Sequence, residues 1–212
     1  MSSIEVTPLF GIPLYKSSIS PIDPITLAKL LNLKYEVPTY QDQILTHEES
    51  AERRLLDRPS LATLKKQIQE KINDYVYNVI GADNSLQWEI TTSWVNRAKF
   101  GEYHASHWHS NSIISGVLYL KVDEKSGSIC FHKAHNWHNL FGNTFKFDSN
   151  KLTNYNSDTL LFSPKTFDIL LFPSTLAHSV PPNESTEDRF SLAFNVFPRG
   201  VIGKGGNSEL TL

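Results

Sequence analysis

Apolar and polar residues along the first 35 positions predict an extended arm followed by a short helix. Apolar residues within 1–20 are interrupted by Pro8 and Pro13, so this arm can form an edge strand at most. Asp23 is placed to cap a helix over about 24–33, in which the leucines and isoleucine form one apolar stripe.

A longer helical pattern follows after a polar stretch. Residues 36–58 show no clean period, and the charged run 46–57 is typical of a solvated surface. Apolar residues then recur at three- or four-residue spacing over 61–79, with Ser60 as the expected N-cap and Gly81 as the stop. This helix should pack its apolar face on a sheet.

Beyond Gly81 the pattern predicts strands. Residues 86–92 alternate between apolar and polar, the period of a half-buried strand. Further apolar runs with turn residues between them lie at 113–122, 128–131, 159–162, 167–172 and 190–197. Many short strands after two helices predict a mainly β, α+β fold, a sandwich or barrel with the N-terminal helices on one sheet.

The length of 212 residues suits a single domain over 1–212. We divide it into an arm with helices (1–84), a β core (85–200) and a glycine-rich tail (201–212), which could pack across a homodimer. Residues 132–158 read as a long insertion between two strands, and such loops are usually functional.

Composition narrows the class of protein. Apolar residues make up 40% and charged residues 20%, and the net charge of −2 argues against a dedicated nucleic-acid binder. Cys130 is the only cysteine, so no internal disulfide can form, and its apolar strand predicts burial. We see no signal peptide and no membrane-spanning segment, and we expect a cytoplasmic protein without a membrane partner.

Histidines cluster in the second half: there are eight, and all but His47 lie between His104 and His178. His107 and His109 are two residues apart, so in an extended segment they share a face roughly 7 Å apart. Two such imidazoles can meet one metal ion about 2 Å from each nitrogen. His178, just past an apolar strand, is the candidate third ligand. His104 has an odd spacing from His107 and is expected on the opposite face, beside the site.

Arg189 and Ser191 form a second pair at i, i+2 on a predicted strand. An arginine fork beside a hydroxyl suits bidentate capture of a carboxylate. An ion pair of Arg189 with Asp188 or Glu187 would instead be structural, and this pattern alone leaves both readings open.

Together these features resemble the iron(II)/2-oxoglutarate oxygenase superfamily, close to its prolyl-hydroxylase-like branch, over about residues 94–198. In that family a glycine precedes the first ligand, as Gly101 does here. The family's H-x-D/E pair falls on His107 and His109, and its distal histidine falls on His178 behind FDILLFPS.

The same resemblance assigns the co-substrate contacts. Tyr119 in VLYLK matches a tyrosine that often hydrogen-bonds 2-oxoglutarate, and Arg189 with Ser191 matches the R-x-S pair that holds its distal carboxylate. TPLFGIPLY, HWHSNS and FPSTLAHSVPPN extend the likeness over nearly the whole chain, to a group of uncharacterised oxygenases that brings no settled substrate with it.

The resemblance implies a double-stranded β-helix, that is, a jelly-roll or cupin-like barrel. It also implies Fe(2+), 2-oxoglutarate and O2 as cofactor and co-substrates. The expected reaction is hydroxylation of a C–H bond with release of succinate and CO2. The prime substrate is unidentified: a peptide or protein side chain and a small metabolite are both permitted.

One position departs from the family rule, because His109 stands where a carboxylate is expected. Three imidazoles still leave three open positions on iron, but the ion keeps its full double positive charge. Three histidines are also a catalytic zinc set. Two alternatives therefore stay open: a three-histidine cupin-like enzyme without 2-oxoglutarate (an iron dioxygenase or a zinc hydrolase), and a non-catalytic metal-binding relative.

His132, His135 and His138 are spaced three apart in FHKAHNWHN. A second metal site is conceivable, but without helical periodicity we favour a substrate-facing or surface loop. Trp108 and Trp137 would give the mouth of the site an apolar lining.

Overall fold

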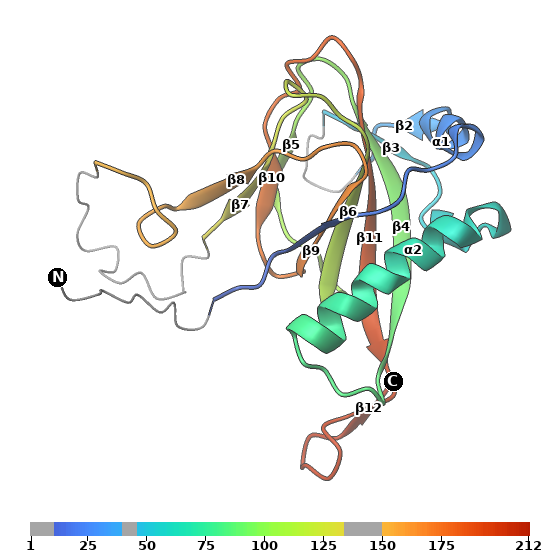
Figure 1. The fold of residues 1–212 in the computed structure, drawn as a ribbon, viewed down its shortest axis with the longest axis vertical. Helices are drawn as coiled ribbons and strands as arrows, with labels where there is room; N and C mark the ends of the chain where they lie inside the picture. The colour runs from blue at the N-terminus through green and yellow to red at the C-terminus, as the bar shows by residue number, and fades with distance from the viewer. Residues whose placement is uncertain (1–10, 40–45, 134–149) are drawn as a thin grey trace.

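The computed structural model describes residues 11–39, 46–133 and 150–212 (Figure 1). Its strand pairs are antiparallel and form two main sheets. The larger sheet contains, in spatial order, β1 (Tyr15–Ser18), β9 (Asp168–Pro173), β6 (Ile114–Lys121), β11 (Arg189–Arg199), β4 (Gln87–Ala98), β3 (Glu48–Ser50) and β2 (Tyr35–Glu36). The smaller sheet contains β5 (His104–His107), β10 (His178–Val180), β7 (Ile129–His132) and β8 (Thr159–Phe162). The tail forms a separate hairpin of β12 (Val201–Ile202) and β13 (Leu210–Thr211).

The helices precede the β core and cover one side of the larger sheet. They are α1 (Pro24–Leu31), two 3-10 turns (Leu55–Asp57 and Pro59–Leu61), α2 (Ala62–Asn73) and a π-helical continuation (Asp74–Val79). Figure 1 shows α2 crossing in front of β6, β11 and β4. No helix within the described ranges is long and apolar enough to span a bilayer.

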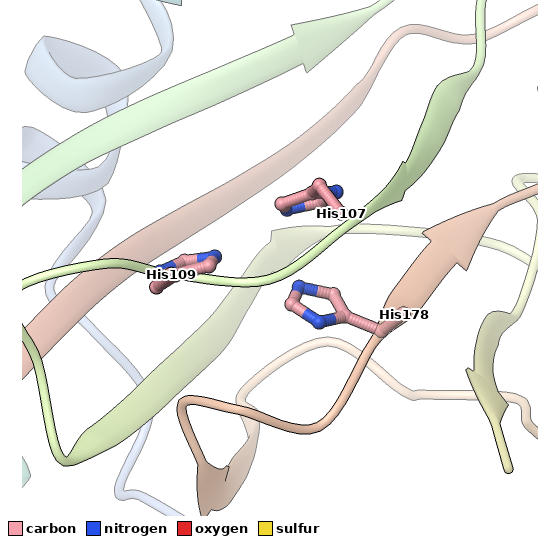
Figure 2. A group of neighbouring side chains, drawn as sticks. All are labelled: His107, His109 and His178. Carbon is pink, nitrogen blue, oxygen red and sulfur yellow. The ribbon is translucent and has the colours of Figure 1, made fainter. Parts of the chain in front are cut away.

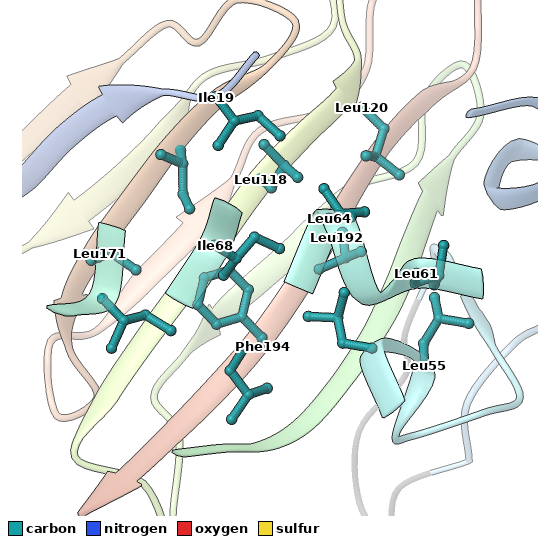
Figure 3. Packing of buried hydrophobic residues seen from close by; sticks show 14 of the residues in the cluster. Ile19, Leu55, Leu61, Leu64, Ile68, Leu118, Leu120, Leu171, Leu192 and Phe194 are labelled. Carbon is teal, nitrogen blue, oxygen red and sulfur yellow. The ribbon is translucent and has the colours of Figure 1, made fainter. Parts of the chain in front are cut away.

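Side chains of the larger sheet alternate between two cores. On the outer face, toward α2, Leu118, Leu192 and Phe194 pack beneath Ile68 (Figure 3). The inner face is turned toward the smaller sheet, and its apolar residues pack with those of β7: Val117, Tyr119, Leu170, Phe172, Ile129 and Phe131. Because both faces are covered, these strands read as continuous apolar runs.

This arrangement confirms the predicted α+β double-stranded β-helix with helices packed on one sheet. The Asp23 cap of α1 is also confirmed, since its carboxylate accepts a hydrogen bond from the Thr26 amide at 2.9 Å. The predicted edge strand is β1, which pairs only with β9 among the described strands.

Two local predictions are wrong. Ser60 does not cap α2, because the 3-10 turn at Pro59–Leu61 runs directly into the helix and Leu61 occupies the N-cap without a side-chain hydrogen bond. The charged run 46–57 is a solvated surface only in part, since Arg53, Arg54 and Asp57 are exposed and the start of the run is buried. Its strand β3 pairs with the edge of β4, which satisfies its backbone, and His47 and Glu49 are buried at 2% and 3% exposure.

Candidate metal and carboxylate site

Two neighbouring strands of the smaller sheet place the predicted metal ligands. His107 ends β5, His178 begins β10, and the two are directly opposite each other in the antiparallel register. His109 lies two residues beyond β5, where its amide donates to the Ser174 carbonyl at 3.0 Å. Figure 2 shows the three rings converging, and one nitrogen of each lies within 4.8 Å of the others. The structure thus brings these three histidines together.

Hydrogen bonds fix which nitrogen His107 and His178 present. The Nδ1 atom of His107 lies 2.9 Å from the Ala105 carbonyl, and that of His178 lies 3.0 Å from the Leu176 carbonyl. A carbonyl oxygen only accepts, so each Nδ1 carries the proton and donates it. Each Nε2 is then left with a free lone pair, the state in which imidazole binds a metal.

His109 reaches the same state through a side chain. Its Nδ1 donates to Oδ1 of Asn195 at 2.6 Å. Asn195 is held in turn, because its Nδ2 donates to Thr92 at 3.0 Å and Ser115 donates to its Oδ1 at 3.2 Å. The histidine in the carboxylate position is therefore oriented by a partner on the inner face of β11.

Burial keeps these imidazoles uncharged. Loss of solvent lowers the pKa of His107 to about 4 and that of His178 to about 3, and it also lowers the pKa of His109. Neighbouring imidazoles of the cluster lower the pKa of His178 further. Near neutral pH all three rings are neutral, as coordination requires. The donor set fits a divalent transition metal.

Arg189 begins β11 and is buried at 8% exposure. The two carboxylates that could have bound it are engaged elsewhere: Asp188 pairs with Arg97 at 2.6 Å, and Glu187 pairs with Lys121 at 2.7 Å. No ion pair involves Arg189 within the described residues. Burial lowers the pKa of its guanidinium, which shows the cost of holding this charge away from water.

A small cleft adjoins this guanidinium. Ser191, His47 and His104 line it with Arg189. The ring of His104 stacks on that of His107 with centroids 4.0 Å apart, which links the cleft to the three-histidine cluster. The cleft thus combines a buried cation with polar side chains, as a carboxylate site requires.

Tyr119 lies on β6, directly opposite Ser191 in the register. It is completely buried, and its hydroxyl has no hydrogen-bond partner within the part of the chain that the structure describes. Burial raises its pKa to about 12, so the hydroxyl keeps its proton. The Arg189 guanidinium lies 6.0 Å from the centre of its ring. Because buried polar groups are normally paired, this hydroxyl is a candidate ligand contact, although Tyr119 is not among the residues that line the cleft.

Comparison with known families identifies the chain. Residues 92–195 match the family model described as "Putative 2OG-Fe(II) oxygenase". Over this segment the chain is similar to the iron(II)/2-oxoglutarate oxygenases that the model describes. The match runs from β4 to β11 and spans the three histidines, Tyr119, Arg189 and Ser191. It confirms the family resemblance of the sequence. Comparison with curated protein sequences gives no match.

Solved structures of oxygenases have the same fold as this chain. An oxidoreductase of the 2OG-Fe(II) oxygenase family from Burkholderia pseudomallei is 14% identical, with a TM-score of 0.57 over 86% of this chain and 83% of that one. HygX from Streptomyces hygroscopicus, with nickel, 2-oxoglutarate and hygromycin B bound, is 12% identical, with a TM-score of 0.56 over 87% and 82%. The non-heme alpha ketoglutarate dependent epimerase SnoN is 10% identical, with a TM-score of 0.57 over 88% and 78%.

One prediction about the candidate site is corrected. His104 does not lie on the opposite face from His107, because their rings stack at an interplanar angle of 14°. In the register His178 pairs with His107 but Val180 pairs with His104, so β5 has one extra residue between these pairs. This β-bulge reverses the alternation on which the prediction relied.

The sequence analysis did not predict two residues of the candidate site, Asn195 and His47. Asn195 had a signal: it continues the i, i+2 series of Arg189 and Ser191 along the inner face of β11. His47 had no such signal, because the charged run 46–57 in which it lies has the pattern of a polar surface. Cys130 is buried as predicted.

The predicted second histidine group is only partly visible. His132 Nε2 lies 2.8 Å from the Ser179 hydroxyl, which leaves it outside the metal cluster. His135, His138 and Trp137 lie outside the described residues. Trp108, the other tryptophan predicted at the mouth, is exposed at 66%.

Proposed function

We propose that this protein is an iron(II)- and 2-oxoglutarate-dependent oxygenase. His107, His109 and His178 would hold the iron through their Nε2 atoms. Arg189 and Ser191 would bind the distal carboxylate of 2-oxoglutarate. The observation that carries the proposal is the buried Arg189, which has no carboxylate partner among the described residues and lines a cleft that adjoins the three histidines.

The electrostatics of the cleft favour this ligand. A buried guanidinium without a counter-ion is costly, and a carboxylate would restore hydrogen bonds and neutralise the charge. The free hydroxyl of Tyr119 offers a further donor beside it. The unpaired Tyr119 hydroxyl and the Arg189 guanidinium, which forms no ion pair within the described residues, both support a carboxylate ligand here.

Iron, 2-oxoglutarate and O2 would supply the oxidising chemistry. The chain itself would hold the ion, orient the co-substrate and limit water. Phe172 and Phe131 pack around His178, with ring centroids 4.9 Å and 6.1 Å from its imidazole. This apolar wall keeps the His178 side of the centre dry and its ring neutral.

The third histidine sets this centre apart from the two-histidine, one-carboxylate rule. With three neutral imidazoles the ion would keep its double positive charge, and anionic ligands would bind it more strongly. Both charged parts of the site, the ion and Arg189, would therefore attract a dicarboxylate.

The reaction we propose is hydroxylation of a C–H bond in an unidentified substrate, with release of succinate and CO2. The substrate class stays open between a peptide or protein side chain and a small metabolite. One structural neighbour is described as an epimerase, so analysis of the product decides the reaction type once a substrate is known.

A first test is succinate formation from 2-oxoglutarate by protein loaded with fresh iron(II) and ascorbate, without prime substrate. We expect slow uncoupled turnover that His178→Ala abolishes through loss of the metal. Calorimetry on nickel-loaded protein should show 2-oxoglutarate binding, weakened at least about tenfold in Arg189→Leu.

Each contrary result has a defined meaning. Metal binding without turnover or 2-oxoglutarate binding would favour the three-histidine enzyme that does not use this co-substrate, since three histidines also hold catalytic zinc. Failure of the folded protein to bind any divalent metal would overturn the proposal.

A further inference from the structure

A buried histidine–carboxylate pair lies beside the cleft and outside the region that matches the family model. His47 precedes β3, and Glu49 lies within it. Nε2 of His47 is 3.3 Å from Oε1 of Glu49, and Arg53 pairs with the same carboxylate. Glu49 therefore has its charge compensated, and it holds one nitrogen of the His47 ring.

The other nitrogen of this ring is unpaired. Nδ1 of His47 is buried and has no hydrogen-bond partner among the described residues, although the residue lines the cleft together with Arg189 and Ser191. The ring also stacks on His104, with centroids 4.1 Å apart. His104 stacks in turn on His107. The ring is thus fixed from two sides, and only Nδ1 is left for a ligand.

We infer that His47 is a second donor to the distal carboxylate of 2-oxoglutarate, opposite Arg189, and that Glu49 positions it. The inference rests on the proposed function and deepens it. For Nδ1 to donate, the ring must carry a proton on both nitrogens. The Glu49 carboxylate would then accept from Nε2, and the ligand's carboxylate would accept from Nδ1.

This assignment explains why β3 docks where it does. A purely structural pair would satisfy both ring nitrogens, because leaving a buried polar atom unpaired is costly. Placing that atom beside an unpaired buried guanidinium is expected of an anion site. Residues outside the family match would then tune the affinity for the co-substrate.

The experiment compares two ligands on three variants. Calorimetry on nickel-loaded protein would measure the binding of 2-oxoglutarate and of 2-oxobutyrate. The second ligand has the keto-acid end but no distal carboxylate. His47→Gln places an amide near the Nε2 position, so it keeps a contact to Glu49 and removes the donor at Nδ1. His47→Asn places an amide near Nδ1 and serves as the matched control. Glu49→Gln keeps the His47 ring and its Nδ1 atom but weakens the contact that positions the ring.

We expect His47→Gln to weaken 2-oxoglutarate binding by roughly tenfold or more and to leave 2-oxobutyrate binding unchanged. His47→Asn should restore part of the affinity, and Glu49→Gln should give an intermediate loss. Thermal unfolding of each nickel-loaded variant checks that the fold persists.

Equal losses for both ligands, or no loss for either, would overturn the inference while leaving the proposed function intact. If the unaltered protein binds nickel but not 2-oxoglutarate, both the inference and the proposed function are wrong.

Discussion

The two faces of β11 differ in chemistry although they belong to one backbone. Its outer face is apolar and closed beneath α2, whereas its inner face contributes polar side chains to the site. The outer-face residues are Phe190, Leu192, Phe194 and Val196, and the polar inner-face residues are Arg189, Ser191 and Asn195.

The difference shows how this fold separates stability from binding. On the outer face each side chain is surrounded by apolar partners. Gly116 lies so close to the Phe194 ring that a Cβ there would not fit. On the inner face the Tyr119 hydroxyl is unpaired and Arg189 has no counter-ion among the residues described, and both features cost stability. We infer that the outer face stabilises a strand whose inner face is built for ligands.

The largest expected effect is on the outer face. Phe194→Ala should lower the free energy of unfolding by about 3–5 kcal/mol, because a fully buried ring is lost and the cavity cannot collapse. Urea unfolding of the metal-free protein measures this loss. Nickel affinity of the fraction that stays folded should be unchanged. A parallel loss of metal affinity would show that the two faces are not independent.

Much of the fold could be predicted because hydrophobic periodicity encodes it directly. The strands at 113–122, 167–172 and 190–197 correspond to β6, β9 and β11, whose two buried faces make their apolar runs continuous. The start of α2 and the burial of residues 46–57 could not be predicted. Both depend on tertiary docking against β4, which leaves no pattern in the local sequence.

The site was predictable where ligands follow a regular strand. Arg189 and Ser191 share a face at i, i+2, and the structure places both at the cleft. His104 was misplaced because a bulge in β5 breaks that rule. His47 was missed because it reaches the cleft from a distant segment, through a strand pairing that only the folded chain reveals.

A smaller effect should arise on the inner face at Asn195. Asn195→Leu removes the acceptor that orients His109, and such changes near metal ligands typically cost 10–100-fold in metal affinity. Competition with a chelator of known affinity for nickel measures the change. Asn195→Asp keeps the acceptor and should retain affinity. The free energy of unfolding of metal-free Asn195→Leu should fall much less than that of Phe194→Ala. An equally large fall would show that the inner face contributes as much to stability as the outer face.

The last expected effect is the pH dependence of the metal-free protein, which should originate on the inner side of the fold. The folded pKa values of His107 and His178, about 4 and about 3, lie below the ordinary 6.5. At pH values between the folded pKa values and 6.5, the unfolded chain binds protons that the folded chain does not. The stability that these neutral histidines contribute is therefore fully present above about pH 6.5 and falls as the pH decreases. Thermal unfolding between pH 7 and 4.5 should therefore show a falling Tm, with a shallower slope in His178→Gln. Phe194→Leu, on the outer face, should lower the whole curve without changing its slope. An identical slope in His178→Gln would show that the acid sensitivity arises elsewhere.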